Sequence, residues 1–338
     1  MKCINNSLKD KRILAIFLTL CLLFSFTACG KKSNASYNVY KTTDELRISS
    51  SYDAKSNIQL MGQNLCTPTD QNSEQEAAND IGTSKSAAVY DITDNKVLYS
   101  YNMLDQVYPA STTKVMTALI AFKYGNLDQE VTVGDDILNL ETGSSVAHLN
   151  PGDVLTLRQL IYGLMLPSGN DAAIAIADAV GGSVDGFADM MNKEALQLGA
   201  TQTHYVNANG LHDESHYTTV YDMYLIFQEA CKYDEFVQVI SSLSYNAYYR
   251  NGSGAAVQNT WTNSCRYING KKKSPEGVSV IGGKTGTTGE AKYCLVLLST
   301  SSNGHQLISL VYGADTVYNL YLDMNEILSS SQAKLIGQ

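Results

Sequence analysis

Three short motifs constrain this chain of 338 residues more than any other feature, because they must converge in space if they act together. A Ser-Thr-Thr-Lys occupies residues 111–114, a Ser-Gly-Asn residues 168–170, and a Lys-Thr-Gly residues 284–286. Taken singly, each motif could be no more than the start of a helix or a surface turn. Their order along one chain, each in a distinct expected setting, favours one site for nucleophilic chemistry.

The first motif supplies a nucleophile together with a base. A serine hydroxyl is a weak nucleophile until a neighbouring group removes its proton. Residues three apart on a helix share a face, so the Lys114 amine can approach the Ser111 hydroxyl. A lysine in water is protonated, but burial and a second positive charge lower its pKa. Lys284 is the expected second charge, so the chemistry itself requires the first and third motifs to meet.

The pattern of apolar residues predicts one folded domain over residues 84–330, followed by a short tail at residues 331–338. Helices are expected from Ser111 to about residue 125 and over residues 156–165, 171–180, 183–198 and 316–328. A β-hairpin is expected over residues 87–100, with its turn at residues 91–95; residues 278–300 are expected to be rich in β-structure, and residues 305–313 to form a further strand. Because strands from both ends enclose a helical middle, we predict an α+β fold, with an antiparallel sheet flanked by helices and an inserted helical subdomain.

Residues 1–28 have the pattern of a secretion signal, with positive charges before an apolar run at residues 13–26. That run is shorter than the roughly 18 residues of a spanning helix. Residues 26–29, Phe-Thr-Ala-Cys, resemble the lipobox of bacterial lipoproteins, and we predict lipidation of Cys29. Ordinary cleavage near Ala28 and a retained anchor are the alternatives. Lipidation implies an exported protein on the outer face of the bacterial cytoplasmic membrane, and ordinary cleavage a secreted one.

Residues 29–83 are polar and have no sustained apolar period, which predicts a flexible tether. A flexible coil of about 50 residues spans on the order of 40 Å. The net charge of −9 argues against a nucleic-acid partner, and the basic run at residues 271–273 is expected to be a solvated turn. Of the seven cysteines, four lie beyond Cys29, and their spacing suits neither a zinc site nor a dense disulfide framework; they are Cys66, Cys231, Cys265 and Cys294.

The chain around the motifs resembles the low-molecular-mass penicillin-binding proteins that are serine D-alanyl-D-alanine carboxypeptidases. The resemblance covers roughly residues 84–328 and is carried by residues 109–119, 164–173, 209–211, 216–219 and 282–288. It implies the β-lactamase and transpeptidase-like fold, and release of the terminal D-alanine from peptidoglycan stem peptides through an acyl-enzyme. It also implies inhibition by β-lactam antibiotics, and neither a metal nor another cofactor.

The same resemblance implies a role for each motif residue. Ser111, Lys114 and Ser168 would be catalytic, with Ser168 relaying a proton between the lysines and the leaving group. The backbone amides of Ser111 and Thr287 would bind the oxyanion. The remaining substrate-binding residues would be Asn170, Lys284, Thr285, Gly286 and Thr287.

Two departures from this family bear on the substrate. Many relatives carry an arginine in the final strand and helix region that helps to bind the terminal carboxylate, whereas no arginine follows Arg266 here. Asp315 and Leu320 stand in that vicinity, and Lys292 either supplies the charge or is simply exposed. The β-rich C-terminal domain and anchor of many relatives are also missing, so the N-terminal lipid is expected to replace that anchor.

Three other functions stay open. A class A-like β-lactamase shares the motifs, but its Glu-x-x-Leu-Asn should follow the middle motif, and the nearest match, residues 136–139, precedes it. A D,D-endopeptidase that cleaves cross-links is a close variant. A non-hydrolytic, penicillin-binding lipoprotein that senses the wall is the third.

Overall fold

The structure is a computed structural model that describes residues 65–67 and 82–337. The predicted signal, the predicted lipidation site Cys29 and most of the predicted tether lie outside the described residues. Over the described ranges, none of the helices combines the length and the apolar character needed to cross a membrane.

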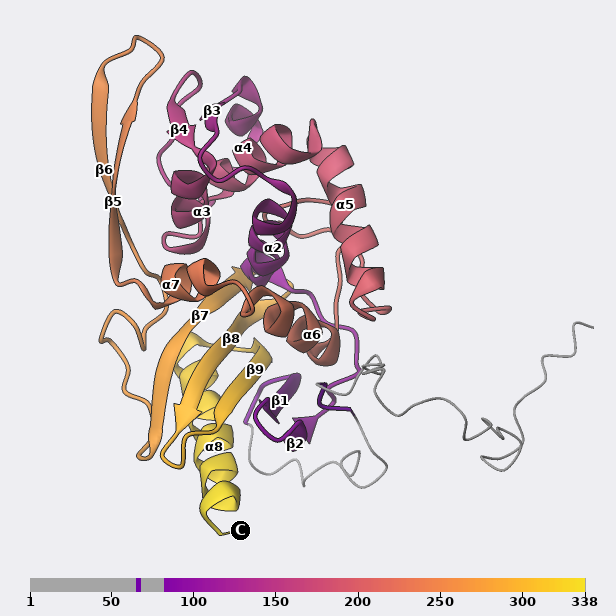
Figure 1. Cartoon of the computed structure of the whole chain (residues 1–338). Helices are drawn as coiled ribbons and strands as arrows, with labels where there is room; N and C mark the ends of the chain where they lie inside the picture. Colours follow the sequence, from indigo (N-terminus) through magenta and orange to yellow (C-terminus); the bar gives the residue numbers. More distant parts are fainter. Residues whose placement is uncertain (1–64, 68–81, 338) are drawn as a thin grey trace, which may run out of the picture. The chain divides into compact units, whose positions relative to one another are not determined.

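A five-stranded antiparallel sheet with the strand order β2-β1-β9-β8-β7 forms the centre of the domain (Figure 1). Two strands come from the start of the domain, β1 (Ser86–Asp91) and β2 (Lys96–Tyr101). Three come from its end, β7 (Val278–Thr288), β8 (Lys292–Ser301) and β9 (Gln306–Ala314). β1 pairs with β9 along its whole length. The prediction of one sheet completed by distant segments is therefore confirmed.

The sheet separates two apolar layers, and its side chains alternate between them as strand geometry requires. On β1, Ala87 and Val89 face the layer of α8 (Val317–Ile336), whereas Ala88 and Tyr90 face the opposite layer. α6 (Val220–Ala230) and α7 (Asp234–Ser241) cover that opposite face, and α8 lies behind the sheet (Figure 1).

The closing helix is longer than the sequence predicts. α8 continues to Ile336, and Ser331, Gln332 and Leu335 are buried in it. The predicted tail is therefore wrong for residues 331–336. No glycine or proline interrupts the helix before Gly337, and Leu335 completes its apolar contact with the sheet.

The helical subdomain begins with a 3-10 turn, η1 (Ala110–Thr113), which runs directly into α2 (Lys114–Tyr124). α3 (Leu157–Met165), α4 (Asn170–Gly181) and α5 (Val184–Gln197) follow, close to the predicted bounds. Local signals set these bounds. Thr156 and Gln159 form a capping box at the start of α3, Ser183 caps α5, and Gly182 ends α4 in the left-handed conformation.

A second sheet, with the order β3-β4-β5-β6, was not predicted. Its strands are β3 (Glu130–Thr132), β4 (Val154–Thr156), β5 (Ser244–Arg250) and β6 (Ala256–Thr262). β5 and β6 form a hairpin, and Trp261 on β6 donates its indole N–H to the backbone oxygen of Ala147 at 2.8 Å. This sheet thereby supports residues 141–149, which border the site described below.

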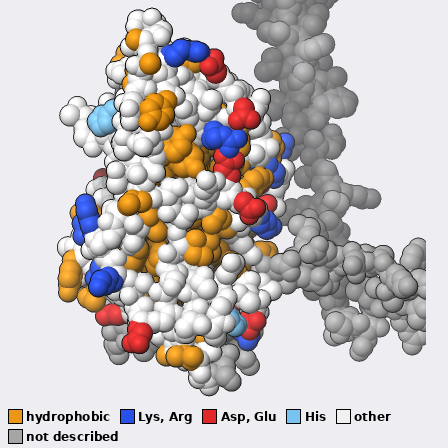
Figure 2. All heavy atoms as spheres, turned by 60° about the vertical axis from the view of Figure 1, so that its left-hand side comes forward, with side chains coloured by type: hydrophobic (Ala, Val, Ile, Leu, Met, Phe, Trp, Pro, Cys, Tyr) orange, Lys and Arg blue, Asp and Glu red, His pale blue; other side chains and the backbone are white. Residues whose placement is uncertain are grey.

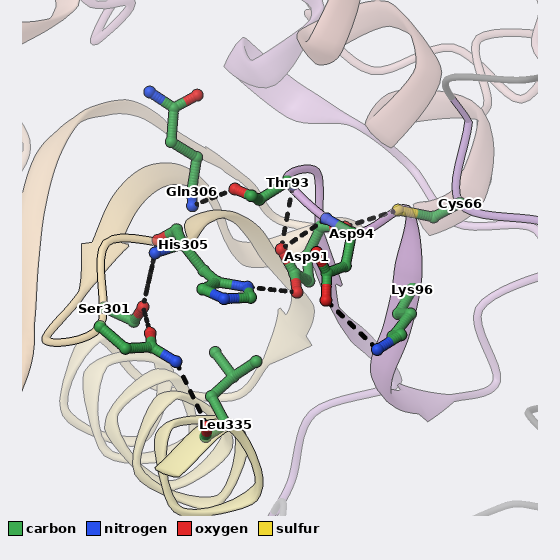
Figure 3. Close-up of polar contacts among 10 residues, drawn as sticks. Cys66, Asp91, Thr93, Asp94, Lys96, Ser301, His305, Gln306 and Leu335 are labelled. Carbon is green, nitrogen blue, oxygen red and sulfur yellow. Dashed lines mark hydrogen bonds and ion pairs between the residues drawn. The ribbon is translucent and has the colours of Figure 1, made fainter. Parts of the chain in front are cut away.

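A polar cluster joins the first hairpin to β9 (Figure 3). The Asp91 carboxylate accepts the backbone N–H groups of Thr93 and Asp94 and lies 2.8 Å from Nδ1 of His305. Asp91, Asp94 and His305 present ligand atoms close enough together to hold a metal ion. Each atom of the cluster also has a protein partner, since Asp94 pairs with Lys96. We assign this cluster a structural role.

Cys66 lies inside the predicted tether but is fully buried against the domain. Its backbone N–H donates to the Tyr224 hydroxyl at 2.8 Å, and its thiol donates to the backbone oxygen of Asp91 (Figure 3). Burial raises the pKa of the Cys66 thiol to about 11, as expected for an inert core cysteine. Leu65–Thr67 therefore packs on the domain, and the prediction that all of residues 29–83 are tether needs this correction, because a small apolar thiol can fill a core gap.

Figure 2 shows acidic and basic side chains interspersed on one face of the molecule, among the described residues coloured there. Lys271–Lys273 lie in the predicted turn, where Lys271 and Lys273 are exposed and Lys272 is half-buried with its amine over the Tyr318 ring.

Candidate active site

Ser111 lies on a strained turn between the sheet and the helical subdomain. Ala110, which precedes it, has a φ of +46°, in a region that residues other than glycine rarely adopt. Thr112 donates its hydroxyl to the backbone oxygen of Pro109 at 2.7 Å, and its hydroxyl lies 2.8 Å from that of Tyr312 on β9. The turn is thereby held against the sheet, while Ser111 stays partly exposed.

Lys114 is fully buried and reaches three polar atoms. Its Nζ lies 2.9 Å from Oγ of Ser111, 2.7 Å from Oδ1 of Asn170 and 2.6 Å from the backbone oxygen of Asn209. Burial, followed by the charge of Lys284, lowers the pKa of Lys114 well below its usual value. A neutral amine has two N–H donors and one lone pair. The oxygens of Asn170 and Asn209 can accept the two N–H groups. If both N–H groups are occupied in this way, the lone pair of the neutral amine is free to accept from the Ser111 hydroxyl, which is the arrangement that a general base requires.

Lys284 is the second buried lysine and lies on β7, the edge strand of the sheet. Its Nζ donates to Oγ of Ser168 at 2.9 Å and to the backbone oxygen of Thr285 at 2.7 Å. Burial lowers the pKa of Lys284 to about 7, so charged and neutral forms coexist near neutral pH. Ser168, with a φ of +64°, lies on the turn between α3 and α4. The second and third motifs therefore meet through one hydrogen bond.

Asn170 and Asp171 begin α4, and only the first of them was predicted to belong to the site. The Asn170 backbone N–H donates to Ser145, while the two Asp171 oxygens accept the N–H groups of Ala147 and Leu149. Both residues thus tie residues 145–149 to the start of α4. Carboxylates are favoured in the first turn of a helix, which is the sequence signal for Asp171.

The backbone of residues 206–211 contributes to the site without any catalytic side chain. Asn209 supplies the oxygen that accepts from Lys114, and Thr117 on α2 donates to the neighbouring backbone oxygen of Ala208 at 2.6 Å. Gly210 has a φ of +84°, and a Cβ there would lie 1.9 Å from the backbone oxygen of Ala110. Only glycine permits this close approach. The sequence pattern of residues 209–211 had been noted as a resemblance, but no role followed from it.

A cleft of about 280 Å³ opens over Ser111. It is lined by Ser111, Glu141, Thr142, Gly143, Ser144, Ser145, Asn170, Asn209, Gly210, Leu211, His212, Thr287, Thr288, Gly289 and Glu290. Gly286 brings β7 close to the nucleophile, because a Cβ there would lie 3.0 Å from the backbone nitrogen of Ser111. The predicted oxyanion amides of Ser111 and Thr287 thus belong to two segments that flank one opening.

Two threonines on β7, Thr285 in the third motif and Thr287 directly after it, take part in local contacts. The Thr287 hydroxyl donates to the backbone oxygen of Gly286 at 2.8 Å. The Thr285 hydroxyl lies 3.0 Å from that of Ser264, a residue that the sequence had not indicated. Thr285 and Ser264 together place two hydroxyl groups beside Lys284.

Neither Asp315 nor Leu320, which stand in the vicinity where the resemblance leads one to expect an arginine, carries a positive charge. Leu320 lies on α8 and is buried, and Asp315 is exposed and accepts hydrogen bonds from Thr83 and Asn319. Lys292 is exposed at the start of β8. Lys114 and Lys284 are the lysines whose contacts with Ser111 and Ser168 the structure shows directly.

This sheet-and-helix fold, with a serine beside a buried lysine, defines a serine enzyme of the penicillin-binding and β-lactamase type. Comparison with known proteins narrows that class. Residues 71–316 match the family model described as D-alanyl-D-alanine carboxypeptidase, peptidase S11. The chain belongs to this D-alanyl-D-alanine carboxypeptidase family.

Individual relatives agree. The chain is 35% identical over 239 residues to D-alanyl-D-alanine carboxypeptidase DacF of Bacillus subtilis, covering 69% of this chain but only 58% of that relative. It is 36% identical over 230 residues to the D-alanyl-D-alanine carboxypeptidase of Streptomyces sp. K15, covering 65% of this chain and 77% of that relative. The crystal structure of the Streptomyces K15 DD-transpeptidase superposes with a TM-score of 0.69 at 32% identity, over 74% of this chain and 97% of that one.

Proposed function

We propose that this protein is a serine D-Ala-D-Ala carboxypeptidase that removes the terminal D-alanine from peptidoglycan stem peptides. The observation that carries the proposal is the surrounding of Lys114, whose Nζ lies 2.9 Å from Oγ of Ser111 and also contacts two oxygens that can accept both N–H groups of a neutral amine. The family membership supports the choice of substrate.

The acylation step follows from these contacts. Lys114 removes the proton of Ser111, and Oγ attacks the carbonyl carbon of the penultimate D-alanine. The backbone amides of Ser111 and Thr287 stabilise the oxyanion that forms. Ser168 relays the proton that Lys114 has taken to the departing D-alanine nitrogen, and Lys284 holds the Ser168 hydroxyl in place. The neutral Lys114 then takes a proton from the water that attacks the ester, and this proton returns to Oγ of Ser111 as the shortened stem peptide leaves.

Substrate binding falls to the residues around this centre. Asn170 offers its side-chain amide to the substrate backbone. Lys284 attracts the terminal carboxylate, and the hydroxyl groups of Thr285 and Thr287 accept or donate hydrogen bonds beside it. Gly286 keeps β7 close enough to the nucleophile for the peptide to lie along the strand edge.

The deciding experiment incubates the purified protein with a peptide that ends in D-Ala-D-Ala and measures the release of D-alanine. We expect release by the wild type and none by Ser111→Ala. Mass spectrometry after penicillin treatment should find a long-lived adduct on Ser111. No D-alanine release from the wild type would overturn the proposal.

The same measurements separate the other functions. A short-lived penicillin adduct would indicate a β-lactamase. A stable adduct on a protein that does not turn over the peptide would indicate a non-hydrolytic penicillin-binding protein. Products from intact cross-linked wall would identify a D,D-endopeptidase. We favour the carboxypeptidase because the family model that matches is that of carboxypeptidases.

We also propose that the protein is exported and held at the membrane through a lipid on Cys29. The sequence of residues 26–29 supports this proposal, because it resembles the lipobox of bacterial lipoproteins. Metabolic labelling with a fatty acid should mark the wild type and leave Cys29→Ala unlabelled.

A further inference from the structure

His216 contacts the serine-bearing turn from outside the three motifs and has no part in the mechanism above. Its side chain is 2% exposed. Nε2 lies 2.8 Å from the Thr113 hydroxyl, and Nδ1 lies 3.2 Å from the backbone nitrogen of Val206. The imidazole therefore bridges η1 and the start of residues 206–211.

The partners of His216 define its tautomer. The backbone N–H of Val206 can only donate, so Nδ1 must accept and carries no proton. The ring proton is then on Nε2, which donates to the Thr113 hydroxyl. Burial keeps the ring neutral, because it lowers the pKa of His216 to about 4.

The link through His216 joins the same two segments as the hydrogen bond between Lys114 and Asn209. Thr113 and Lys114 are consecutive residues, and Val206 and Asn209 lie three residues apart on the facing segment. One link joins Thr113 to Val206 through the imidazole, and the other joins Lys114 directly to Asn209. Any change in the spacing of the two segments moves the oxygen that fixes one donor of Lys114.

We propose that His216 is a positioning residue that sets the distance between the Ser111 turn and Asn209, and so aims the lone pair of Lys114 at Ser111. This inference rests on the proposed function, in which Lys114 is the general base. It adds a condition to that function, because the link exists only while His216 is neutral.

Protonation of His216 breaks the link. Nδ1 would then carry a proton that faces the N–H of Val206, and two donors cannot bond to each other. Four titratable groups act on the ring, and of these Asp213 favours the charged form while His204, His212 and Lys114 oppose it. Tyr205 packs against the ring edge. We expect acylation to fall as the pH drops through about 4.

The test measures the rate at which penicillin acylates Ser111, with kcat and KM for the peptide, in His216→Ala and His216→Gln. Losing a buried hydrogen bond of this kind should slow acylation in His216→Ala by roughly tenfold to a hundredfold, with KM changed less than about threefold. Glutamine can donate to Thr113 and accept from Val206 at every pH. His216→Gln should therefore recover part of the rate and lose the decline near pH 4.

Thr113→Val keeps the shape of the side chain and carries the test if His216→Ala does not fold. It should slow acylation about tenfold, and adding it to His216→Gln should cost less than the product of the two single effects. His204→Ala is the matched control, since His204 contacts Ser215 rather than Thr113, and its rate should stay within about twofold of wild type.

The outcomes are distinguishable. A wild type that neither forms a penicillin adduct nor releases D-alanine overturns the proposed function itself. An active wild type, with His216→Ala and Thr113→Val both within about twofold of it, overturns the role of His216 and leaves the proposed function standing. An unchanged acid decline in His216→Gln does the same.

Discussion

Lys114 and Lys284 are two buried lysines in one site, yet their surroundings differ. Lys114 begins α2 and has two fixed oxygen acceptors besides Ser111. Lys284 lies on the edge strand β7 and bonds to Ser168 and to the backbone oxygen of its own neighbour, Thr285. Burial lowers the pKa of both, well below the usual value for Lys114 and to about 7 for Lys284.

This difference shows that burial alone does not assign a lysine its role. The amine whose donors are both taken by fixed oxygens has a lone pair in a defined direction and suits a base. The amine that titrates near neutral pH keeps a fractional charge and suits an electrostatic role. Four measurements can test whether the two lysines have these separate roles.

Lys114→Ala should have the largest effect, because it removes the base from Ser111. We expect penicillin acylation to slow at least a thousandfold, near the upper end of general base contributions. The measurement is adduct formation followed by mass spectrometry. Lys123→Ala on the same helix is the control, since the Lys123 amine binds Glu194 and not Ser111, and its acylation rate should remain. A Lys114→Ala protein that acylates within tenfold of wild type would contradict the assignment.

Lys284→Ala should come second, with a loss of about a hundredfold in kcat/KM for a D-Ala-D-Ala peptide. The loss should exceed that of the same substitution in a relative that retains the late arginine, because here the other cation is missing. Lys292→Ala, which removes an exposed charge from the adjacent strand, should stay within about twofold. If Lys292→Ala lowers kcat/KM more than Lys284→Ala does, then Lys292 rather than Lys284 supplies the positive charge that binds the terminal carboxylate, and our assignment is wrong.

The third prediction concerns pH. Lys284 is charged below about pH 7 and neutral above it, so kcat/KM for a peptide with a free terminal carboxylate should fall as the pH rises through 7. A peptide with an amidated C-terminus should lack this decline, and so should Lys284→Ala. The free energy of unfolding should change in the opposite sense. The free energy of unfolding rises between about pH 7 and 10.5, because in this range the Lys284 amine is protonated in the unfolded chain but neutral in the folded protein.

Thr117→Val should have the smallest effect. It removes the hydrogen bond that holds the backbone oxygen of Ala208, next to the acceptor of Lys114, while it keeps the shape of the side chain. A net loss of about 1 kcal/mol corresponds to a roughly fivefold slower acylation. The decline through pH 7 should be unchanged, because Lys284 is not involved. A shifted decline would mean that the two lysines do not act separately.

Much of the fold was predictable because local signals determine it. Thr156 and Ser183 mark helix starts with their own hydroxyl groups, Gly182 ends a helix without a steric penalty, and the strands alternate between two apolar layers. The second sheet was not predictable in the same way. β3 and β4 have three residues each, and β5 and β6 expose one face, so their periodicity is weak.

The candidate site likewise contains residues that the sequence could indicate and groups that it could not. Ser111, Lys114, Ser168, Asn170 and Lys284 carry reactive side chains at fixed spacings, and the sequence alone could indicate them. The backbone oxygen of Asn209 could not be indicated, because every residue has such an oxygen and only its position distinguishes it. The bridge of His216 depends likewise on two segments about 100 residues apart.

The reactive groups of this protein, and most of the helices and strands that carry them, can be identified from side-chain chemistry and local periodicity. Which lysine has its donors occupied and which keeps a charge depends on the folded molecule, because burial and the direction of a lone pair arise from neighbours that are remote in the chain.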